Sequence, residues 1–318
     1  MNFKKSIFCI LFVFFAWSVY GCTSRTASTQ SCSHTAVVQT ASSDNSLLWR
    51  ISGNGLASPS YLFGTHHLTP LSILDRVPGL NQAFEATEQV VGELDLRDMQ
   101  IIQMQMMQHA MMPEGISYES LLSAEDITLL DSKLKSLLGV GIEHLGMLNP
   151  AMLTQTITLT LYQRDFPTTA SVSLDEHFQQ KAIARARPIK ALDTPEFQIY
   201  ALFGVSSIER QAEILMCLVR HPERGTELLK RLHELYYAFD INGLYAMVIE
   251  ENKNSPCPST DEEINALTRN RPLRNIDQLS AIINEKPSFI AVGALHLPGE
   301  YGLIEGLRRA GFTVEPVN

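Results

Sequence analysis

Short apolar runs typical of β-strands lie near both ends of this 318-residue chain, and helix-patterned sequence fills the stretch between them. The first two runs flank Gly53-Asn54-Gly55, which indicates a hairpin. We therefore expect a mixed α/β (α+β) fold, in which strands from both ends share a central β-sheet that is flanked by helices, with a large helical middle region. The runs are residues 47–51, 60–63, 90–94, 188–192, 288–292 and 312–314.

Helical periodicity dominates residues 98–162, and it is broken at 112–115 and near Asn149-Pro150. Thr226 is a candidate N-cap for a later helix, because its hydroxyl can accept from the first free backbone N–H groups. We expect the later helices at residues 195–203, 208–220 and 227–239.

The longest apolar run, Ile7 to Trp17, stands at the very start of the chain behind Lys4 and Lys5. Its 11 residues are too few for a membrane-spanning helix, which needs about 20, and the basic flank is typical of an export signal. Gly21-Cys22 follows and resembles the lipobox of bacterial lipoproteins. This predicts a signal peptide at 1–21 and lipidation, with palmitate among the acyl groups, at Cys22. Ordinary cleavage that leaves Cys22 unmodified is the alternative.

Residues 22–46 are expected to be a flexible tether. In residues 23–46, 12 of 24 side chains are Ser or Thr, and no strand or helix period is present. Such a stretch cannot bury enough surface to offset its chain entropy. The folded body would be residues 47–318, exported and held on a membrane at the periplasm or cell surface. A formal net charge of −9 gives no support to nucleic-acid binding.

Cys217 and Cys257 are the only two cysteines of this expected body. Export would permit a disulfide between them, and the sequence leaves open whether it forms. No Cys-x-x-Cys pair is present, so neither a zinc ribbon nor a thioredoxin-type site is indicated.

A Gly-x-x-His-Leu motif follows two of the strand-like runs. It runs from Gly64 to His67 and Leu68 near the start of the body, and from Gly293 to His296 and Leu297 near its end. Glycine at a strand end lets the chain turn or approach a ligand closely, and a histidine three residues later then lies at the sheet edge where α/β proteins place their sites. A third copy, residues 141–145, lies in helical sequence without a preceding strand, and we interpret it as accidental.

Glu93 ends a third strand-like run, and parallel neighbouring strands would bring it close to His67 and His296. Two imidazoles and one carboxylate are a common metal-binding set in hydrolases, with a position open for water. The alternative is that the histidines are ordinary hydrogen-bonded residues and Glu93 is solvated. We expect Asp95 to support Glu93 or a metal-bound histidine, and His66 to be a packing or supporting residue that points the opposite way.

Methionines are concentrated in the first helical stretch. Copper binding is one interpretation, but a flexible apolar helix face or a substrate-contacting surface is the one we favour. The five methionines are Met104, Met106, Met107, Met111 and Met112.

The two strand–Gly-x-x-His elements and the glutamate strand resemble the TraB/Tiki family, also called GumN-type, over nearly the whole body from Leu47 to Val317. The chain departs from the family pattern at His66, where an aliphatic residue is usual, and at Thr268, where an acid often precedes Arg-Asn. The further matching stretches are residues 174–188, 192–198, 267–270 and 293–303.

The family includes animal metalloproteases that cleave secreted signalling proteins and depend on a divalent metal and on the Gly-x-x-His histidines. The resemblance therefore implies a metal-dependent hydrolase, most directly a peptidase with an unidentified peptide or protein substrate. Its metal-binding and catalytic residues would be His67, Glu93 and His296, and the ion would be Mn, Co or Zn.

The resemblance also implies supporting roles and a wider kinship. Gly64 and Gly293 would shape the loops, and Arg269 and Asn270 would hold a carboxylate ligand or a substrate carbonyl. The fold would be similar to that of the erythromycin-esterase and haem-binding-lipoprotein superfamily. Because a shared framework does not fix the reaction, a lipoprotein that binds haem or another ligand without turnover is the alternative.

Overall fold

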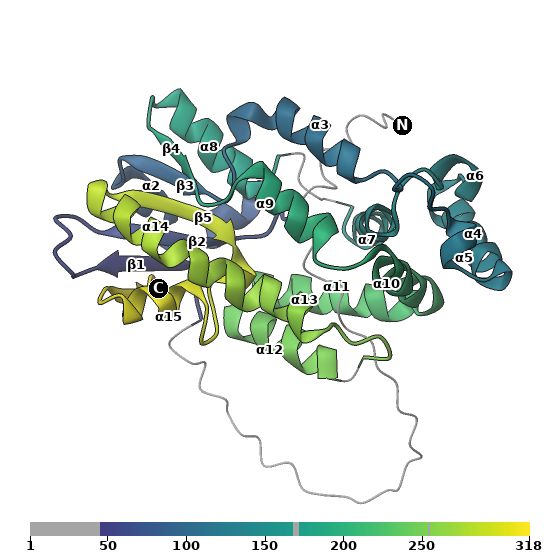
Figure 1. Ribbon diagram of the computed structural model, residues 1–318. Helices are drawn as coiled ribbons and strands as arrows, with labels where there is room; N and C mark the ends of the chain where they lie inside the picture. The colour runs from purple at the N-terminus through teal and green to yellow at the C-terminus, as the bar shows by residue number, and fades with distance from the viewer. Residues whose placement is uncertain (1–44, 168–171, 254) are drawn as a thin grey trace, which may run out of the picture.

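The computed structural model describes residues 45–167, 172–253 and 255–318 (Figure 1). The expected signal peptide, Cys22 and almost all of the expected tether lie outside these residues. Within the described part, the Ser46 hydroxyl donates to the carbonyl oxygens of Leu48 and Val317. The first described residues therefore lie beside the last ones.

Six strands in the described residues form one mixed sheet, which confirms the expected α/β fold class. They are β1 (Leu48–Ser52), β2 (Ser60–Thr65), β3 (Gln89–Gly92), β4 (Ile189–Ala191), β5 (Ser288–Gly293) and β6 (Thr313–Pro316). Their order across the sheet is β4-β3-β5-β2-β1-β6. β1 pairs antiparallel with β2 and with β6, whereas β4, β3, β5 and β2 are parallel neighbours.

β5 joins the two halves of the sheet. It lies between β2 and β3, with Val292 opposite Gly64 and Ile290 opposite Val91. All six of its residues are buried, as its continuous apolar sequence predicts for a central parallel strand. Because parallel strands end at the same edge of a sheet, the carboxyl ends of β2, β3 and β5 meet there.

Helices cover the sheet and extend well beyond it. The helices of the first half are η1 (Leu71–Arg76), α2 (Leu80–Glu85), η2 (Leu96–Asp98), α3 (Met99–His109), α4 (Tyr118–Leu121), α5 (Ala124–Leu138), α6 (Ile142–Leu145) and α7 (Pro150–Asp165). Those of the second half are α8 (Leu174–Ala184), α9 (Pro195–Ile199), η3 (Tyr200–Gly204), α10 (Ile208–Arg220), α11 (Pro222–Tyr237), α12 (Ile241–Lys253), α13 (Asp261–Asn265), η4 (Ala266–Asn270), α14 (Arg271–Glu285), η5 (Ala294–His296) and α15 (Leu303–Arg309).

One face of the sheet packs on α2 and α8, and α14 and α15 lie on the other (Figure 1). Phe63 of β2 and Phe289 of β5 meet Phe84 of α2 and Phe178 of α8, with ring centroids 4.6 to 6.1 Å apart. Aromatic pairs at such separations add about 0.5–1.5 kcal/mol each to the free energy gained from burial. This cluster fixes the strands that carry the site residues.

The expected helical middle region lies beyond the sheet edge to which β5 points (Figure 1). It contains α5, α7, α10 and α11, which pack on one another. No helix in the described ranges is both long enough and apolar enough to cross a membrane.

Most helices and strands lie where the sequence predicts them, but one predicted helix start is wrong. α10 spans the residues expected for it, but α11 begins at Pro222, so Thr226 is not an N-cap. Proline is well suited to the first helical turn because it has no N–H that needs a partner. The Thr226 hydroxyl instead donates to the carbonyl oxygen of Pro222. Cys217 and Cys257 form a disulfide.

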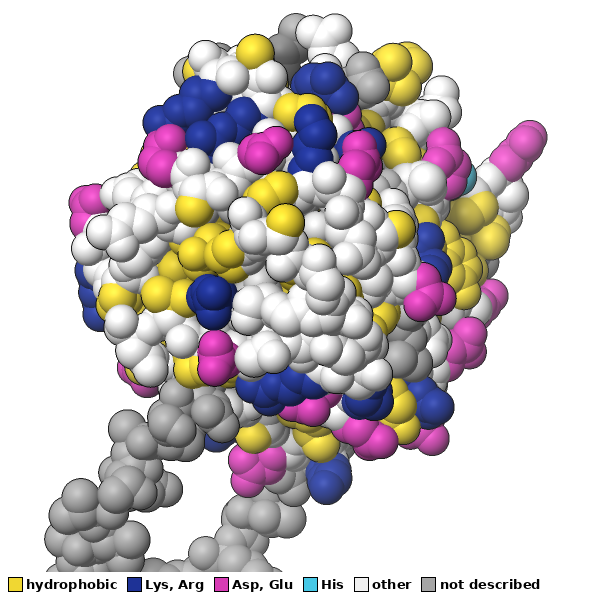
Figure 2. Space-filling model, turned by 90° about the vertical axis from the view of Figure 1, so that its left-hand side faces the viewer, with side chains coloured by type: hydrophobic (Ala, Val, Ile, Leu, Met, Phe, Trp, Pro, Cys, Tyr) yellow, Lys and Arg dark blue, Asp and Glu magenta, His cyan; other side chains and the backbone are white. Residues whose placement is uncertain are grey.

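Figure 2 shows the end of the molecule opposite the edge to which β5 points. Lys and Arg side chains gather in the upper part of this face, with acidic side chains among them. Lys181, Arg185 and Arg187 lie over the ring of Phe84, at 4.6, 5.2 and 4.9 Å from its centroid. The predicted site residues lie at the other end of the strands.

Candidate active site

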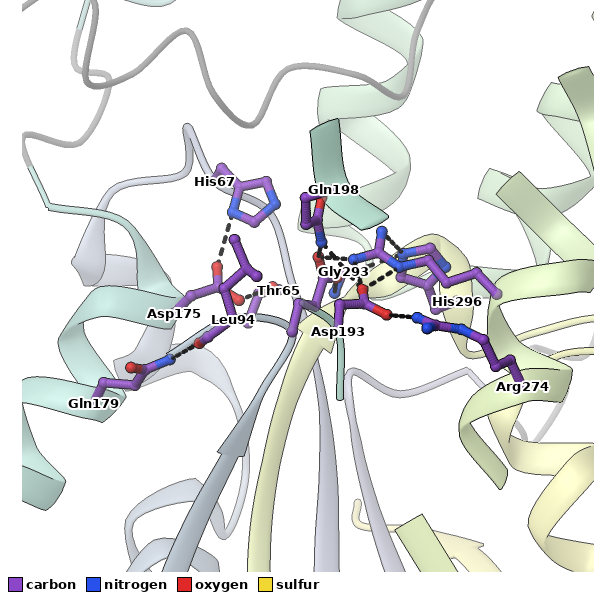
Figure 3. A network of polar contacts seen from close by, with 12 residues as sticks. Thr65, His67, Leu94, Asp175, Gln179, Asp193, Gln198, Arg274, Gly293 and His296 are labelled. Carbon is purple, nitrogen blue, oxygen red and sulfur yellow. Dashed lines mark hydrogen bonds and ion pairs between the residues drawn. The ribbon is translucent and has the colours of Figure 1, made fainter. Parts of the chain in front are cut away.

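The three predicted site residues lie at the carboxyl ends of three adjacent strands. Glu93 directly follows β3, His67 lies two residues after β2, and His296 ends the turn η5 after β5. Figure 3 shows His67 on one side of these strand ends and His296 on the other. The prediction that the strand ends meet is confirmed by the parallel pairing, but the three side chains belong to two separate sets of contacts.

Glu93 is buried, and each of its carboxylate oxygens has a partner. Oε1 accepts from the backbone N–H of Gly293 at 2.8 Å and lies 3.4 Å from His296 Nε2. Oε2 accepts from Arg271 Nη2 at 2.7 Å. A carboxylate buried in this way needs such donors, because removing it from water without them is costly.

The guanidinium of Arg271 links three side chains of the candidate site. Besides Glu93, it donates through Nη1 to His296 Nε2 at 3.0 Å and through Nε to Asp193 Oδ2 at 2.7 Å. Asp193 is also paired with Arg274 and accepts from Gln198 Nε2 at 3.1 Å. Arg271 is 7% exposed, so one buried cation holds two carboxylates and one imidazole together.

The charges in this cluster shift each other's pKa values. Burial alone would raise the pKa of Glu93, but the charges of Arg271, His296 and His67, together with the N–H of Gly293, outweigh it and hold that pKa far below its usual range. Burial raises the pKa of Asp193 although Arg271 opposes the shift. Burial would lower the pKa of Arg271, and the two carboxylates reverse this and raise it. Glu93 and Arg271 therefore remain an ion pair over the ordinary pH range.

His67 belongs to a second set of contacts, on α8. Its Nδ1 lies 2.9 Å from Asp175 Oδ2, and Thr65 Oγ1 donates to Asp175 Oδ1 at 3.0 Å. Burial alone would lower the pKa of His67, but the Asp175 charge and contact raise it above the usual value. A carboxylate on one ring nitrogen fixes the orientation of the imidazole and leaves the other nitrogen to face the site.

Two glycines allow the close approach of the strand ends. A Cβ atom on Gly64 would lie 3.1 Å from Ala294 Cα, and one on Gly293 would lie 3.3 Å from Glu93 Oε1. Both positions are tight for any side chain, so the turn after β5 packs directly on β2 and Glu93. The loop-shaping roles expected for these glycines agree with this packing.

Arg269 and Asn270 are not brought to the cluster. Both are exposed, and the Arg269 guanidinium lies over the ring of Tyr301, 4.4 Å from its centroid. Arg271, two residues later, makes the contacts with Glu93 and His296 instead. Asp95 also differs from expectation, because it pairs with Arg97.

His66 packs among other side chains, and His144 lies at the surface. His66 Nδ1 lies 2.8 Å from Thr69 Oγ1, and its ring lies near Tyr162 and Tyr236. Burial, together with the neighbouring His67, lowers the pKa of His66 to about 3. His144, in the third Gly-x-x-His copy, lies on the short helix α6 with its side chain 68% exposed.

Four residues of the site were not identified from the sequence as site residues: Asp175, Asp193, Gln198 and Arg271. A signal was present for the first three, because they lie in the family-like stretches 174–188 and 192–198. Arg271 directly follows the stretch 267–270, in which the resemblance pointed to Arg269 and Asn270 instead.

The donor types of the site suit a divalent metal, since His67, Glu93 and His296 offer two imidazoles and a carboxylate. The carboxylate behind His67 is also what metal-binding histidines commonly have. The arrangement itself differs: no three His, Cys, Asp or Glu side chains among the described residues are grouped to hold a metal ion. Arg271 contacts the Glu93 and His296 atoms that would serve as ligands. Binding at both would therefore require the guanidinium to leave them.

Comparison with known proteins adds two findings. The TraB/PrgY/gumN family model matches residues 47–316. A zebrafish (Danio rerio) protein described as "Metalloprotease TIKI2" is 24% identical over 315 residues, which are 85% of this chain and 61% of the relative. The chain thus spans about three-fifths of that relative's length. No solved structure matches, so the expected kinship with the erythromycin-esterase and haem-binding-lipoprotein superfamily stays a prediction.

The family match covers all six strands and both Gly-x-x-His elements. It also covers Glu93 and the residues that surround it, among them Asp193 and Arg271. The predicted resemblance is therefore confirmed over the whole sheet and its carboxyl edge. This chain belongs to the TraB/PrgY/gumN family.

Proposed function

We propose that this protein is a metal-dependent hydrolase, a peptidase that acts outside the cytoplasm through His67, Glu93 and His296. The observation that carries the proposal is the position of all three residues at one sheet edge, where a buried Arg271 contacts Glu93 and His296. The family and the relative described as a metalloprotease support the hydrolase class. The substrate would be a peptide or protein.

The chain's own groups suit hydrolysis of a carbonyl compound. Glu93 stays ionised, so it can ligate a metal. It becomes basic enough to accept a proton from water only when Arg271, which lowers its pKa, releases it. His67 is oriented by Asp175. Arg271, which Asp193 anchors from the other side, can stabilise negative charge that develops on a substrate carbonyl oxygen.

His67, Glu93 and His296 would hold the divalent ion, for which Mn, Co and Zn are the candidates. When bound, such an ion lowers the pKa of a coordinated water and polarises a carbonyl. Arg271 would release Glu93 and His296 to admit it, and its contacts with Asp193 would keep the guanidinium beside the site.

Metal analysis of the purified protein, combined with cleavage of a diverse peptide library with and without chelator, tests this proposal. We expect bound divalent metal and cleavage that chelation abolishes. Glu93→Gln should lower turnover by about 10²–10⁴-fold if Glu93 is the general base, with metal retained. If Glu93 is a ligand, metal content should fall together with activity. His67→Ala and His296→Ala should each lower metal content.

His144→Ala is the matched control, because this third Gly-x-x-His histidine is exposed on α6. It should change neither metal content nor cleavage. Full cleavage by metal-free protein, or an equal loss in His144→Ala and His67→Ala, would contradict the assignment. A strong Soret band in the purified protein would indicate the haem-binding alternative.

We also propose that the protein is exported and anchored to a membrane through lipidated Cys22. The basic start, the short apolar run and Gly21-Cys22 motivate this. The Cys217–Cys257 disulfide supports it, because disulfides persist mainly in oxidising compartments. Cys22→Ala should abolish labelling with radioactive palmitate and release the chain from membranes, or stall its processing. Unchanged labelling and fractionation would rule the anchor out.

A further inference from the structure

A pocket of about 680 Å³ shares the helix α9 with the candidate active site. This volume lies within the range of about 300–1,000 Å³ that is usual for ligand pockets. Its walls come from α3, the start of α7, the α9–η3 segment and the start of α10. We call it the amide pocket, because Gln105, Gln108, Asn149 and Gln211 all line it.

Gln211 lines this pocket and carries a buried hydrogen-bond acceptor that is not used. Its Nε2 donates to the carbonyl oxygens of Phe203 at 2.9 Å and Ser206 at 3.0 Å, which fixes the orientation of the amide. Its Oε1 is buried and receives no hydrogen bond from any residue that the structure describes. Gln105 Oε1 is likewise buried and receives no hydrogen bond from the described residues. A buried acceptor without a donor is costly, so a bound N–H group would relieve that cost.

The remaining lining defines which donor would suit the pocket. Among the described residues that line it, Glu196 is the only acidic one and none is Lys or Arg, so His109 is the one basic side chain available to an anionic ligand. Ile199, Phe203 and Ile208 supply apolar walls. The pocket therefore favours a neutral or basic ligand that carries N–H groups and a large apolar substituent.

Exposed methionines continue this apolar surface around the pocket. Met104 and Met107 on α3 are 60% and 38% exposed, and Met111, which also lines the pocket, is 37% exposed. Met147 is 61% exposed and lies beside this segment, because its carbonyl oxygen accepts from the N–H of Met112. Methionine side chains adapt to partners of varied shape, which suits a surface that contacts many sequences.

We propose that the amide pocket binds an extended, non-acidic segment of the peptide substrate, with backbone N–H groups donating to Gln211 and Gln105 and a large apolar side chain between the walls. The inference rests on the proposed peptidase function. The segment would lie next to the candidate active site, because α9 lines the pocket and Gln198 of α9 donates to Asp193 Oδ2 at 3.1 Å. The segment would flank the bond to be cleaved.

Fluorescence anisotropy with dye-labelled peptides tests the pocket separately from turnover. The protein carries Glu93→Gln, so that bound peptides remain intact. Three peptides of equal length are compared: a neutral one with a central Leu or Phe, the same peptide with flanking Asp residues, and the same peptide with N-methylated backbone amides around the apolar residue. We expect saturable binding of the first and binding weaker by about tenfold for the other two.

Gln105→Leu and Gln211→Leu should each weaken binding of the first peptide and reduce the effect of N-methylation, since the acceptor is then gone. Gln103→Leu is the matched control on α3, because Gln103 does not line the pocket. Tyr200→Ala changes an exposed residue that lines the pocket. It should also weaken peptide binding, so it tests the pocket even if the glutamine variants fold poorly.

The outcomes separate this inference from the proposed function. Binding without any cleavage by the wild-type chain would overturn the peptidase assignment and leave the pocket supported. Cleavage whose KM is unchanged by Gln105→Leu and Tyr200→Ala would overturn the pocket alone. No saturable binding, or equal binding of the N-methylated peptide, would also overturn it.

Discussion

Around Arg271, two buried carboxylates and one imidazole share a single guanidinium. Removing one partner of a buried ion pair typically costs about 3–5 kcal/mol, because the other charge is left without compensation. Glu93 and Asp193 therefore require a cation between them, and in this structure Arg271 supplies it. A divalent ion bound at Glu93 and His296 would supply part of this positive charge.

Competition between Arg271 and a metal ion can be measured directly. Arg271→Met should destabilise the metal-free protein by several kcal/mol and raise its affinity for Mn²⁺ or Zn²⁺ by about tenfold or more, since a positive charge no longer repels the ion. Calorimetric titration gives the affinity. Metal should also raise the melting temperature of this variant more than that of the wild type.

Chemical rescue distinguishes competition from a general structural effect. Guanidinium chloride, well below denaturing concentrations, should lower the metal affinity of Arg271→Ala but not that of the wild type. Arg269→Met is the control, because Arg269 is exposed and lies over Tyr301. Metal affinity that is equal or lower in both Arg271 variants would contradict the competition.

At the scale of elements, α13 is the helix that leads the chain into Arg271, and Glu263 holds it in place. The Glu263 carboxylate accepts from Ser206 and from Arg210 at the start of α10, and from the N–H of Thr260, the N-cap of α13. Burial alone would raise the pKa of Glu263, but the Arg210 contact, helped by the other donors, lowers it. The ionised form therefore stabilises the fold.

Glu263→Gln should lower the free energy of unfolding by about 1–3 kcal/mol at neutral pH, the scale of hydrogen bonds to a charged group. A carboxyl with a lowered pKa in the folded state stabilises above its unfolded pKa, about 4.3, and this contribution is lost as pH falls through the folded pKa. The difference between variant and wild type should thus shrink below about pH 4. Urea unfolding of variant and wild type at neutral pH and below about pH 4 measures this difference in the free energy of unfolding.

Glu262→Gln serves as the control for this comparison, because Glu262 lies in the same first turn of α13 and is exposed. It should change the unfolding free energy by only a few tenths of a kcal/mol, as expected for an exposed charge near a helix N-terminus. A difference between Glu263→Gln and wild type that stays constant from neutral to acidic pH would show that the ionised carboxylate is not the stabilising species.

The sequence predicts well what is encoded locally. Apolar runs followed by Gly-x-x-His place His67 and His296 at strand ends, and the hairpin around Gly53 forms as expected. Arg271 could not be predicted as a site residue, because its partner Glu93 is 178 residues away in the sequence. The π-helical turn η4 also changes the helix phase just before it, so that Arg271 rather than Arg269 faces the sheet edge. Neither feature has a local signature in the sequence.

At the scale of the whole molecule, stability should be greatest at the centre of the sheet. β5 is hydrogen-bonded on both sides and fully buried, whereas β6 pairs only with β1 at an edge. We expect β5 amides to exchange hydrogen only through global unfolding and β6 amides through local opening. Hydrogen-exchange mass spectrometry of peptides covering the two strands checks this. Equal protection of β5 and β6 would contradict it.

The position of β5 in the chain determines when the site can exist at all. His67 and Glu93 are made early in synthesis, but the strand that must lie between theirs comes from residues 288–293, close to the end. A growing chain can therefore carry both residues for most of its synthesis without the neighbour that aligns them. A fragment ending before β5 would lack His296 and the strand that aligns His67 with Glu93, however well its helices form.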